Sequence, residues 1–125
     1  MHGTVRFIPH KNGTLVVEEI SGLPAADTSF FALHIHEGGN CSRPDFPNTG
    51  SHYNPGNQDH PLHAGDLPPL LSSDGSAYLT VMTDRFRIKD DIGRTAVIHN
   101  GPNDFRTQPA GNAGNKIACG VIRRA

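Results

Sequence analysis

The sequence predicts an all-β fold, an antiparallel sandwich or flattened barrel, on three observations. The 125 residues include 14 Gly and 10 Pro, which interrupt regular elements at short intervals. Short runs rich in β-branched and aromatic residues alternate with these turn residues. No long stretch repeats apolar residues at helical spacing. A chain of this length is expected to form one domain, residues 1–125, that buries about two thirds of its unfolded surface.

Three strands are expected in the first third of the chain. Thr4–Ile8 and Leu15–Ile20 are apolar runs on either side of a Lys-Asn-Gly turn at residues 11–13. Phe30–His36 follows a segment of Gly, Pro, Ala and Asp. The two runs around the short turn are therefore expected to pair as antiparallel neighbours.

Three more strands are expected later in the chain. Ala77–Thr83 follows the turn sequence Ser-Ser-Asp-Gly at residues 72–75, and Thr95–His99 follows Asp-Ile-Gly at residues 91–93. Ile117–Ile122 is the last expected strand. Short strands separated by such turns favour an antiparallel sandwich or barrel.

Two long segments lack strand character. Residues 38–69 and 100–115 are rich in Gly, Pro, Asn and Asp. Loops of this length within a compact domain usually have a function or an internal tether. We therefore expect each of these two loops to have a function or to be tethered.

The histidines form an ordered series that starts with His34-Ile35-His36. In a strand, residues two apart point to the same face, so His34 and His36 could share a metal while Ile35 packs into a core. Neutral imidazole is a common ligand for copper and zinc, and a carboxylate suits zinc. The series continues with His52, His60, His63, Asp66 and His99. His2 and His10 have no ligand partner nearby in the sequence and are expected to be ordinary surface residues.

Five blocks of the sequence resemble the copper/zinc superoxide dismutase family in its bacterial form. They occur in the family's order and span nearly the whole chain. The resemblance implies a Greek-key β-barrel or sandwich of the immunoglobulin-like type with two long functional loops. The blocks are His34–Gly39, Gly50–Pro55, His63–Pro68, Val97–His99 and Gly111–Ile122.

The resemblance assigns metal ligands residue by residue. It implies a copper site formed by His34, His36, His52 and His99. It implies a structural zinc site formed by His52, His60, His63 and Asp66, so that His52 bridges both metals. The family usually separates its last two zinc histidines widely, whereas His60 and His63 are only three apart here. Both could bind zinc from one turn, only one could bind it, or zinc could bind weakly.

The implied activity is the conversion of superoxide to oxygen and hydrogen peroxide by a redox-cycling copper. His52 and Lys116 take the catalytic positions. Lys116 stands where the family commonly has an arginine, so it keeps the charge but loses the planar fork of donors. Ala110 stands where many members have a threonine that narrows the channel, so a wider opening is expected.

Asn103 falls where the family often has an aspartate that links a copper-ligand histidine to a zinc-ligand histidine. An asparagine side chain has one accepting oxygen and one donating amide, so it cannot accept from both histidines with two oxygens. Asp104, the next residue, is the alternative link.

The two cysteines, Cys41 and Cys119, sit where the family has its disulfide. Two buried free thiols are the alternative. A disulfide is typical of an oxidising compartment, yet the chain shows no signal peptide. Its first residues resemble the family's second strand, so either the N-terminus has been removed or the chain lacks the first strand. Localisation is therefore open, and an extracytoplasmic protein whose N-terminus was removed is compatible with the sequence. Without the first strand, a sheet edge is expected to be open and to favour a homodimer.

The net charge of −1 excludes a global positive field, so any steering of superoxide has to be local, from Lys116 and Arg106. The charge balance gives no indication of nucleic-acid or membrane partners. A non-catalytic copper- and zinc-binding domain of the same fold is the alternative function, and a copper-only or zinc-only domain is a third.

Overall fold

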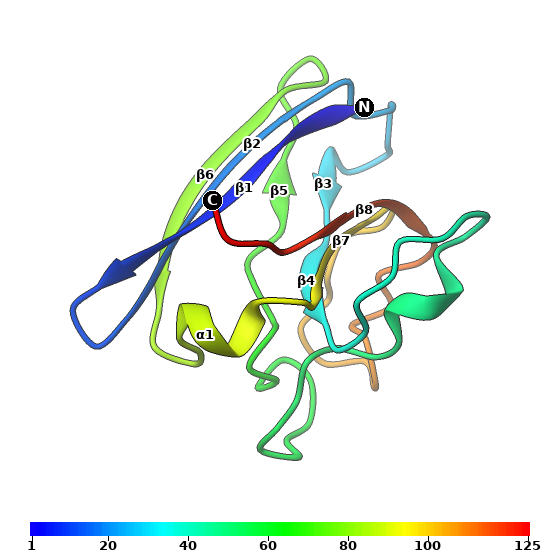
Figure 1. The fold of residues 1–125 in the computed structure, drawn as a ribbon. Helices are drawn as coiled ribbons and strands as arrows, with labels where there is room; N and C mark the ends of the chain where they lie inside the picture. Colours follow the sequence, from blue (N-terminus) through cyan, green and yellow to red (C-terminus); the bar gives the residue numbers. More distant parts are fainter.

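The computed structural model describes residues 1–125 as an arrangement of antiparallel sheets (Figure 1). Every ladder is antiparallel, so the all-β prediction is confirmed. One sheet has the order β1 (His2–His10), β2 (Gly13–Ser21) and β6 (Ala77–Thr83). The other has β4 (Leu33–His36), β7 (Thr95–His99) and β8 (Lys116–Val121), and β3 (Phe30–Phe31) pairs with β5 (Leu70–Leu71).

The expected strand over residues 30–36 is divided at Ala32. The N–H of Ala32 donates to the carbonyl of Gly101, and its own carbonyl accepts from the N–H of His99. These bonds leave the ladder and separate β3 from β4. The short β5 was not predicted, nor were two short helices, η1 (Pro47–Thr49) and α1 (Ile88–Asp91).

The core lies between the two larger sheets. In β2, alternate side chains point inward, so Val16 and Ile20 are buried while Glu19 between them is exposed. Leu33 and Ile35 of β4 are fully buried in the same cluster. Each such aliphatic side chain stabilises the fold by about 1.5–3 kcal/mol on burial.

The free edge of β4 is covered by the first long loop. The N–H of Ile35 donates to Gly65 across 2.8 Å, and the carbonyl of Ile35 accepts from the N–H of Tyr53, also at 2.8 Å. Isolated bridges pair His36 with His52 and His34 with Asp66. The backbone thus sets two loop residues beside the two strand histidines.

Two further contacts fix this loop to the sheets. Cys41 and Cys119 form a disulfide, as expected, which ties the start of the loop to β8. The guanidinium of Arg94 lies over the ring of Tyr53, with 3.9 Å between its Cζ and the ring centroid. No helix of the protein is long and apolar enough to span a membrane.

Candidate metal centre

All seven side chains of the predicted ligand series are buried, and they come together from strands and loops. β4 supplies His34 and His36, β7 supplies His99, and the first long loop supplies the others. His2 and His10 are exposed on β1, away from this group. The buried series is His34, His36, His52, His60, His63, Asp66 and His99.

One group within the centre matches the predicted copper ligands. His34, His36, His52 and His99 each offer one nitrogen, and these nitrogens lie within 4.8 Å of one another. Nε2 of His36 is 3.2 Å from Nε2 of His99. Two imidazole nitrogens that face each other at this distance are well placed to bind one cation between them.

Backbone carbonyls orient two of these rings. Nδ1 of His36 donates to the carbonyl of Gly50 at 2.8 Å, and Nδ1 of His99 donates to the carbonyl of Gly114 at 3.3 Å. A proton held at Nδ1 leaves the Nε2 lone pair free for a metal. The carbonyls thus select the tautomer that a copper site needs.

Three buried ring nitrogens make no hydrogen bond: Nδ1 of His34, Nε2 of His52 and Nδ1 of His60, the last of which has a carboxylate oxygen of Asp66 3.1 Å away. A buried polar atom without a partner is costly, and such atoms call for an explanation. A metal ion on each side of His52 would satisfy all three. The residues therefore fit copper on one side, with four imidazoles, and zinc on the other, with imidazoles and a carboxylate.

The carboxylate of Asp66 gathers the predicted zinc ligands. Its Oδ1 lies 2.8 Å from Nδ1 of His52, and its Oδ2 lies 3.1 Å from Nδ1 of His60 and 3.2 Å from Nδ1 of His63. Nδ1 of His52 and Nδ1 of His63 are 3.2 Å apart. All three histidines thus present Nδ1 to one carboxylate, even though only two residues separate His60 from His63.

A second four-residue group, defined by a mutual distance of 4.8 Å, contains His34, His52, His60 and Asp66. His63 is outside this group but contacts both Asp66 and His52. The direct contacts with the Asp66 carboxylate make His63 a candidate zinc ligand as well, because a metal binds where donor atoms converge. His52 is common to both groups: Nδ1 faces Asp66, and the unpartnered Nε2 is on its other side.

Burial keeps the imidazoles of His34, His36 and His99 neutral. It lowers the pKa of His36 to about 3 and that of His99 to about 4, and neighbouring histidines and Lys116 contribute to the shift. Burial also lowers the pKa of His34. Burial alone would raise the pKa of Asp66, but the hydrogen bond from His52 and the neighbouring imidazoles lower it overall. Neutral imidazoles beside an ionised carboxylate are the forms that bind metals.

Two residues that the sequence did not indicate hold the segment between His60 and His63. The side chain of Gln108 clamps the backbone of His60, accepting from its N–H at 2.9 Å and donating to its carbonyl at 2.8 Å. Nη1 of Arg85 donates to the carbonyls of Pro61 at 2.7 Å and His63 at 3.2 Å. These contacts hold the backbone of the short segment in place, so that both of its histidines can face Asp66.

Asn103, and not Asp104, is the residue between the two metal-ligand groups. Oδ1 of Asn103 accepts from Nε2 of His60 at 2.8 Å, and Nδ2 lies 3.4 Å from Nε2 of His34. Asp104 is exposed and accepts hydrogen bonds from Arg106 and Thr107 within its own turn. At Gly111, where φ is +70°, a Cβ would lie 2.2 Å from Oδ1 of Asn103, so only glycine allows this close approach.

Lys116 is the first residue of β8 and lies near His36 and His99. Its Nζ donates to Oγ1 of Thr49 at 2.7 Å and lies 3.4 Å from the carbonyls of Phe46 and Gly50. Gly50 also accepts from His36. The ammonium is therefore positioned by the same loop that orients a predicted copper ligand. Arg106 is exposed in the second long loop.

A family model described as copper/zinc superoxide dismutase matches residues 1–122. The superoxide dismutase [Cu-Zn] 1 of Aquifex aeolicus is 37% identical, over 97% of this chain and 79% of its own length. That of Deinococcus radiodurans is 38% identical, over 97% of this chain and 76% of its own length.

A solved structure, a SOD-like protein from Bacillus subtilis, has a TM-score of 0.84 and 30% identity, and it covers 95% of this chain and 88% of its own. The Greek-key fold of the immunoglobulin-like type that the sequence predicts is confirmed by this similarity together with the sheet order. Copper and zinc are the cofactors of the family, and the buried histidine groups suit them. The chain belongs to the copper/zinc superoxide dismutase family.

Proposed function

We propose that this protein is a superoxide dismutase that converts superoxide to oxygen and hydrogen peroxide, with a redox-cycling copper and a structural zinc. The observation that carries the proposal is His52, a buried side chain whose two ring nitrogens face two separate donor groups. We assign His34, His36, His52 and His99 to copper, and His52, His60, His63 and Asp66 to zinc.

When bound, copper supplies the one-electron chemistry of both half-reactions. The protein's contribution is a proton held at a defined atom. Of the two ring nitrogens of His52, Nδ1 contacts Asp66 and Nε2 has no hydrogen-bond partner. Nε2 is therefore the atom that takes up a proton in one half-reaction and gives it to the peroxide product in the other. Two superoxide ions and two protons yield one oxygen and one hydrogen peroxide, and the second proton comes from solvent.

Lys116 attracts the anion and His52 supplies the proton. The ammonium group is half-buried and anchored by Thr49, so its charge is fixed near His36 and His99. A charge held in a partly buried position is less screened than one on a mobile surface chain. Lys116 is thus the local source of attraction in a protein of net charge −1.

The alternative is a non-catalytic copper- and zinc-binding domain of the same fold. Two features favour it: a lysine rather than an arginine at residue 116, and an asparagine at residue 103 that cannot accept from both neighbouring histidines. The likeness to a protein described only as SOD-like is in keeping with this alternative.

We also propose that the chain acts as one domain, residues 1–125, outside the reducing cytoplasm. The Cys41–Cys119 disulfide supports this location, because reducing compartments keep thiols free.

The decisive experiment compares metal-free, zinc-loaded and copper/zinc-loaded protein in metal analysis and in a superoxide-consumption assay. We expect one copper and one zinc per chain and activity only in the copper-containing form. His10→Ala is a matched control, because His10 is an exposed histidine outside the centre. Full copper and zinc occupancy with no consumption of superoxide above the metal-free protein would establish the non-catalytic alternative.

A further inference from the structure

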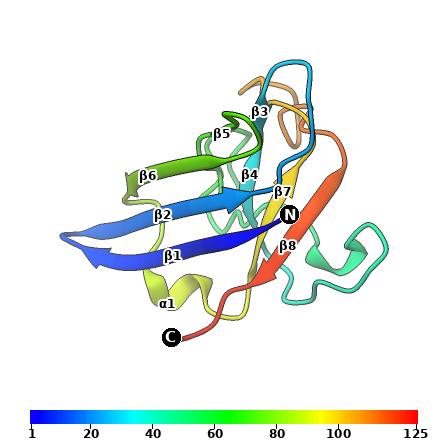
Figure 2. The same ribbon diagram turned by 90° about the horizontal axis from the view of Figure 1, so that it is seen from above.

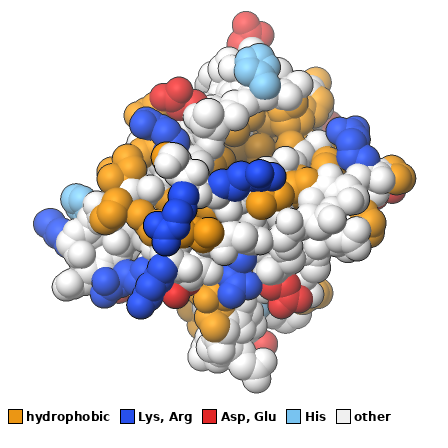
Figure 3. All heavy atoms as spheres, in the orientation of Figure 1, with side chains coloured by type: hydrophobic (Ala, Val, Ile, Leu, Met, Phe, Trp, Pro, Cys, Tyr) orange, Lys and Arg blue, Asp and Glu red, His pale blue; other side chains and the backbone are white.

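The four proposed zinc ligands are buried, and three of them come from one short stretch of chain. The exposed fractions of His52, His60 and His63 lie between 3% and 6%, and that of Asp66 is 9%. On the face drawn in Figure 3, histidine side chains form only small patches, in accord with this burial. Residues 60–66, here called the zinc segment, must therefore aim two imidazoles and a carboxylate at one point from a short backbone.

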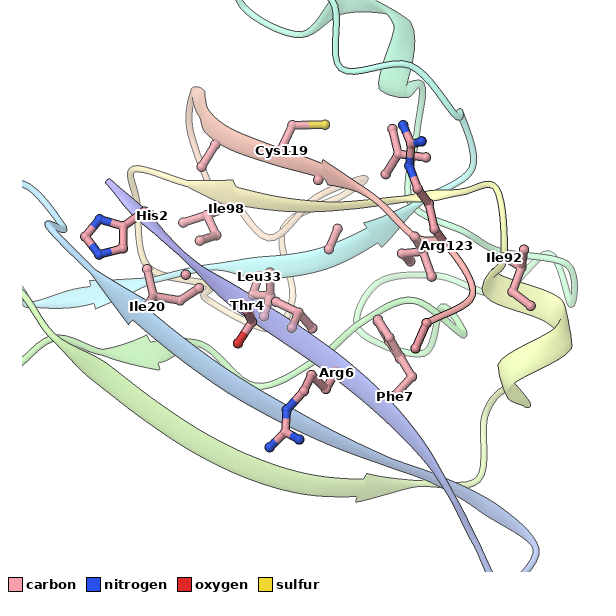
Figure 4. Close-up of a pocket in the computed structure, with 18 of the residues that line it drawn as sticks. His2, Thr4, Arg6, Phe7, Ile20, Leu33, Ile92, Ile98, Cys119 and Arg123 are labelled. Carbon is pink, nitrogen blue, oxygen red and sulfur yellow. The ribbon is translucent and has the colours of Figure 1, made fainter.

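The zinc segment is incompletely packed on one side. A cavity of about 440 Å³ is lined by Pro61 and Asp66 of this segment and by residues 81–85 at the end of β6. Leu62, the residue before His63, is 56% exposed. The larger cavity, of about 910 Å³ between β1 and β8, has none of the proposed metal ligands in its lining (Figure 4). Because side-chain packing is incomplete beside the zinc segment, hydrogen bonds have to fix its backbone.

The second long loop, residues 100–115, fixes His60 by three hydrogen bonds. Oε1 of Gln108 accepts from the N–H of His60 at 2.9 Å, and Nε2 of Gln108 donates to the carbonyl of His60 at 2.8 Å. Oδ1 of Asn103 accepts from Nε2 of the same histidine at 2.8 Å. Nε2 of Gln108 also donates to the carbonyl of Arg106, which orients the amide within its own loop. Both the backbone and the ring of His60 thus depend on this loop.

A different part of the molecule fixes His63. Arg85 follows the end of β6, and its Nη1 donates to the carbonyls of Pro61 at 2.7 Å and His63 at 3.2 Å. β6 belongs to the sheet that carries no metal ligand, whereas β4 and β7 of the other sheet carry copper-side histidines (Figure 2). The two zinc-side histidines are therefore held from two separate places.

We propose that Gln108 and Arg85 are positioning residues for zinc. Gln108 sets the backbone of His60, and Arg85 sets that of His63, so that both imidazoles meet Asp66 although the zinc segment is short. The inference rests on the zinc site of the proposed function and does not depend on superoxide consumption. Groups that orient metal ligands alter metal affinity by about 10- to 100-fold when they are changed.

The effect should be specific to zinc. Nδ1 of His36 and Nδ1 of His99 are oriented by the carbonyls of Gly50 and Gly114, and neither Gln108 nor Arg85 makes a hydrogen bond to a copper-side histidine. A general loss of structure would weaken the binding of both metals. Loss of a positioning residue for the zinc segment should weaken the binding of zinc and largely spare that of copper.

The first test measures zinc and copper affinities of the full chain by competitive chelator titration, starting from metal-free protein. We expect Gln108→Ala and Arg85→Gln each to lower zinc affinity by about tenfold and to change copper affinity by less than about threefold. Both side chains are exposed, so neither change opens a cavity in the core. Arg85→Lys should lose less zinc affinity than Arg85→Gln, because an ammonium group still donates to a carbonyl.

Two matched variants control for the residue types. Gln58→Ala removes a glutamine of the first long loop whose side chain donates only to the carbonyl of Gly56, and Arg87→Gln removes an exposed arginine two positions after Arg85. Both should keep the zinc affinity of the unaltered chain. If Gln108→Ala does not fold, Gln108→Met takes its place with the same expectation, because methionine keeps the length of the side chain without its strong hydrogen bonds.

The second test follows amide hydrogen exchange in residues 100–115 with and without saturating zinc. Coupling between two sites is reciprocal, so a loop that raises zinc affinity is stabilised by zinc to the same extent. We expect zinc to slow exchange in this loop. The slowing should diminish in Gln108→Ala by about the factor lost in zinc affinity, and it should persist in Arg85→Gln, because Arg85 makes no hydrogen bond to the loop.

Three outcomes would overturn the proposal: a zinc affinity within about threefold of the unaltered chain in either variant, equal losses of zinc and copper affinity, or the same zinc-dependent slowing of exchange in Gln108→Ala as in the unaltered chain. The expected losses of zinc affinity in a chain that does not consume superoxide would support the positioning residues and refute the proposed function. Unchanged zinc affinities in an active chain would do the reverse.

Discussion

Asn103 accepts a hydrogen bond from Nε2 of His60 across 2.8 Å, although the two residues are 43 positions apart. The amide nitrogen of the same side chain faces Nε2 of His34 at 3.4 Å. When His34 binds copper through its free Nδ1, its Nε2 carries the proton, so two donors face each other. Asn103 therefore supports His60 through a hydrogen bond and gives no such support to His34.

Replacement of Asn103 by aspartate should therefore strengthen copper binding. A carboxylate accepts from both histidines, and changes of such supporting groups alter metal affinity by about 10- to 100-fold. We expect Asn103→Asp to raise copper affinity by about tenfold in a competitive chelator titration. Asp104→Asn, one residue along in the exposed turn, is the control and should leave it unchanged. A copper affinity that stays the same or falls in Asn103→Asp would show that the amide already serves both histidines.

Removal of His52 should affect both metals. We expect His52→Ala to change the electron paramagnetic resonance spectrum of bound copper and to weaken copper and zinc binding together, because both donor groups lose a ligand. Titrations with each metal separately measure the two affinities. An unaltered copper spectrum with both affinities retained would refute the shared position of His52.

Reduction of the disulfide should destabilise the fold and loosen metal binding. Closing a loop of 78 residues is worth about 4.5 kcal/mol in the chain-entropy model. We expect air-oxidised protein to show no free thiols under denaturing conditions, and reduced protein to melt at a lower temperature. Two reactive thiols in air-exposed, unreduced protein would contradict the bond.

The charge of Lys116 should govern how activity depends on salt. Activity should fall as ionic strength rises, because the screening length is about 10 Å at 0.1 M salt. Lys116→Glu should be slower than Lys116→Ala at low salt with copper still bound, and Lys116→Arg should keep most of the activity. Equal rates for the glutamate and alanine variants would make Lys116 a bystander.

Glu18 should make stability fall as the pH rises. Its carboxyl is fully buried without a hydrogen-bond partner, and burial raises its pKa from 4.5 to about 8. Between pH 4.5 and about 8 the folded protein holds a proton that the unfolded chain has released. The free energy of unfolding therefore falls through this window, by about 5 kcal/mol at most, and is level above it.

Denaturant unfolding at several pH values measures this loss. Glu18→Gln should remove most of it, since an amide stays neutral. Glu19→Gln, at the exposed neighbouring position, should leave the pH dependence as it is. The same dependence in Glu18→Gln as in the unaltered protein would assign the effect to other groups, of which buried Asp91, with a pKa raised to about 7, is the first candidate.

Most of the fold was predictable because it depends on local alternation. Thr14, Val16, Glu18 and Ile20 point inward from β2, as a period of two requires. The breaks were not predictable, because Ala32 leaves the ladder through bonds to Gly101 and His99, which are distant in sequence. The helix α1 has only four residues, too few to show a helical period.

The histidines of the site were predictable from their order, but the residues that support them were not. Gln108 and Arg85 act on backbone groups of His60, Pro61 and His63. Contacts with backbone place no demand on the residue type they reach, so they leave no pattern in the sequence. The choice of Asn103 over Asp104 depended on the course of a loop, which residue spacing does not determine.

The disulfide also has a mechanical consequence. It closes a covalent ring of chain that contains His52, the residues around Asp66, and His99, while His34 and His36 lie just outside it. A pulling force applied at Met1 and Ala125 passes through the sulfur bridge and bypasses this ring. The ring hides about 260 Å of contour length, at roughly 3.3 Å per residue. Tension on the two ends would therefore peel β1 and β2 away while the loop around His52 bears no load, and reduction would expose that loop to the full force.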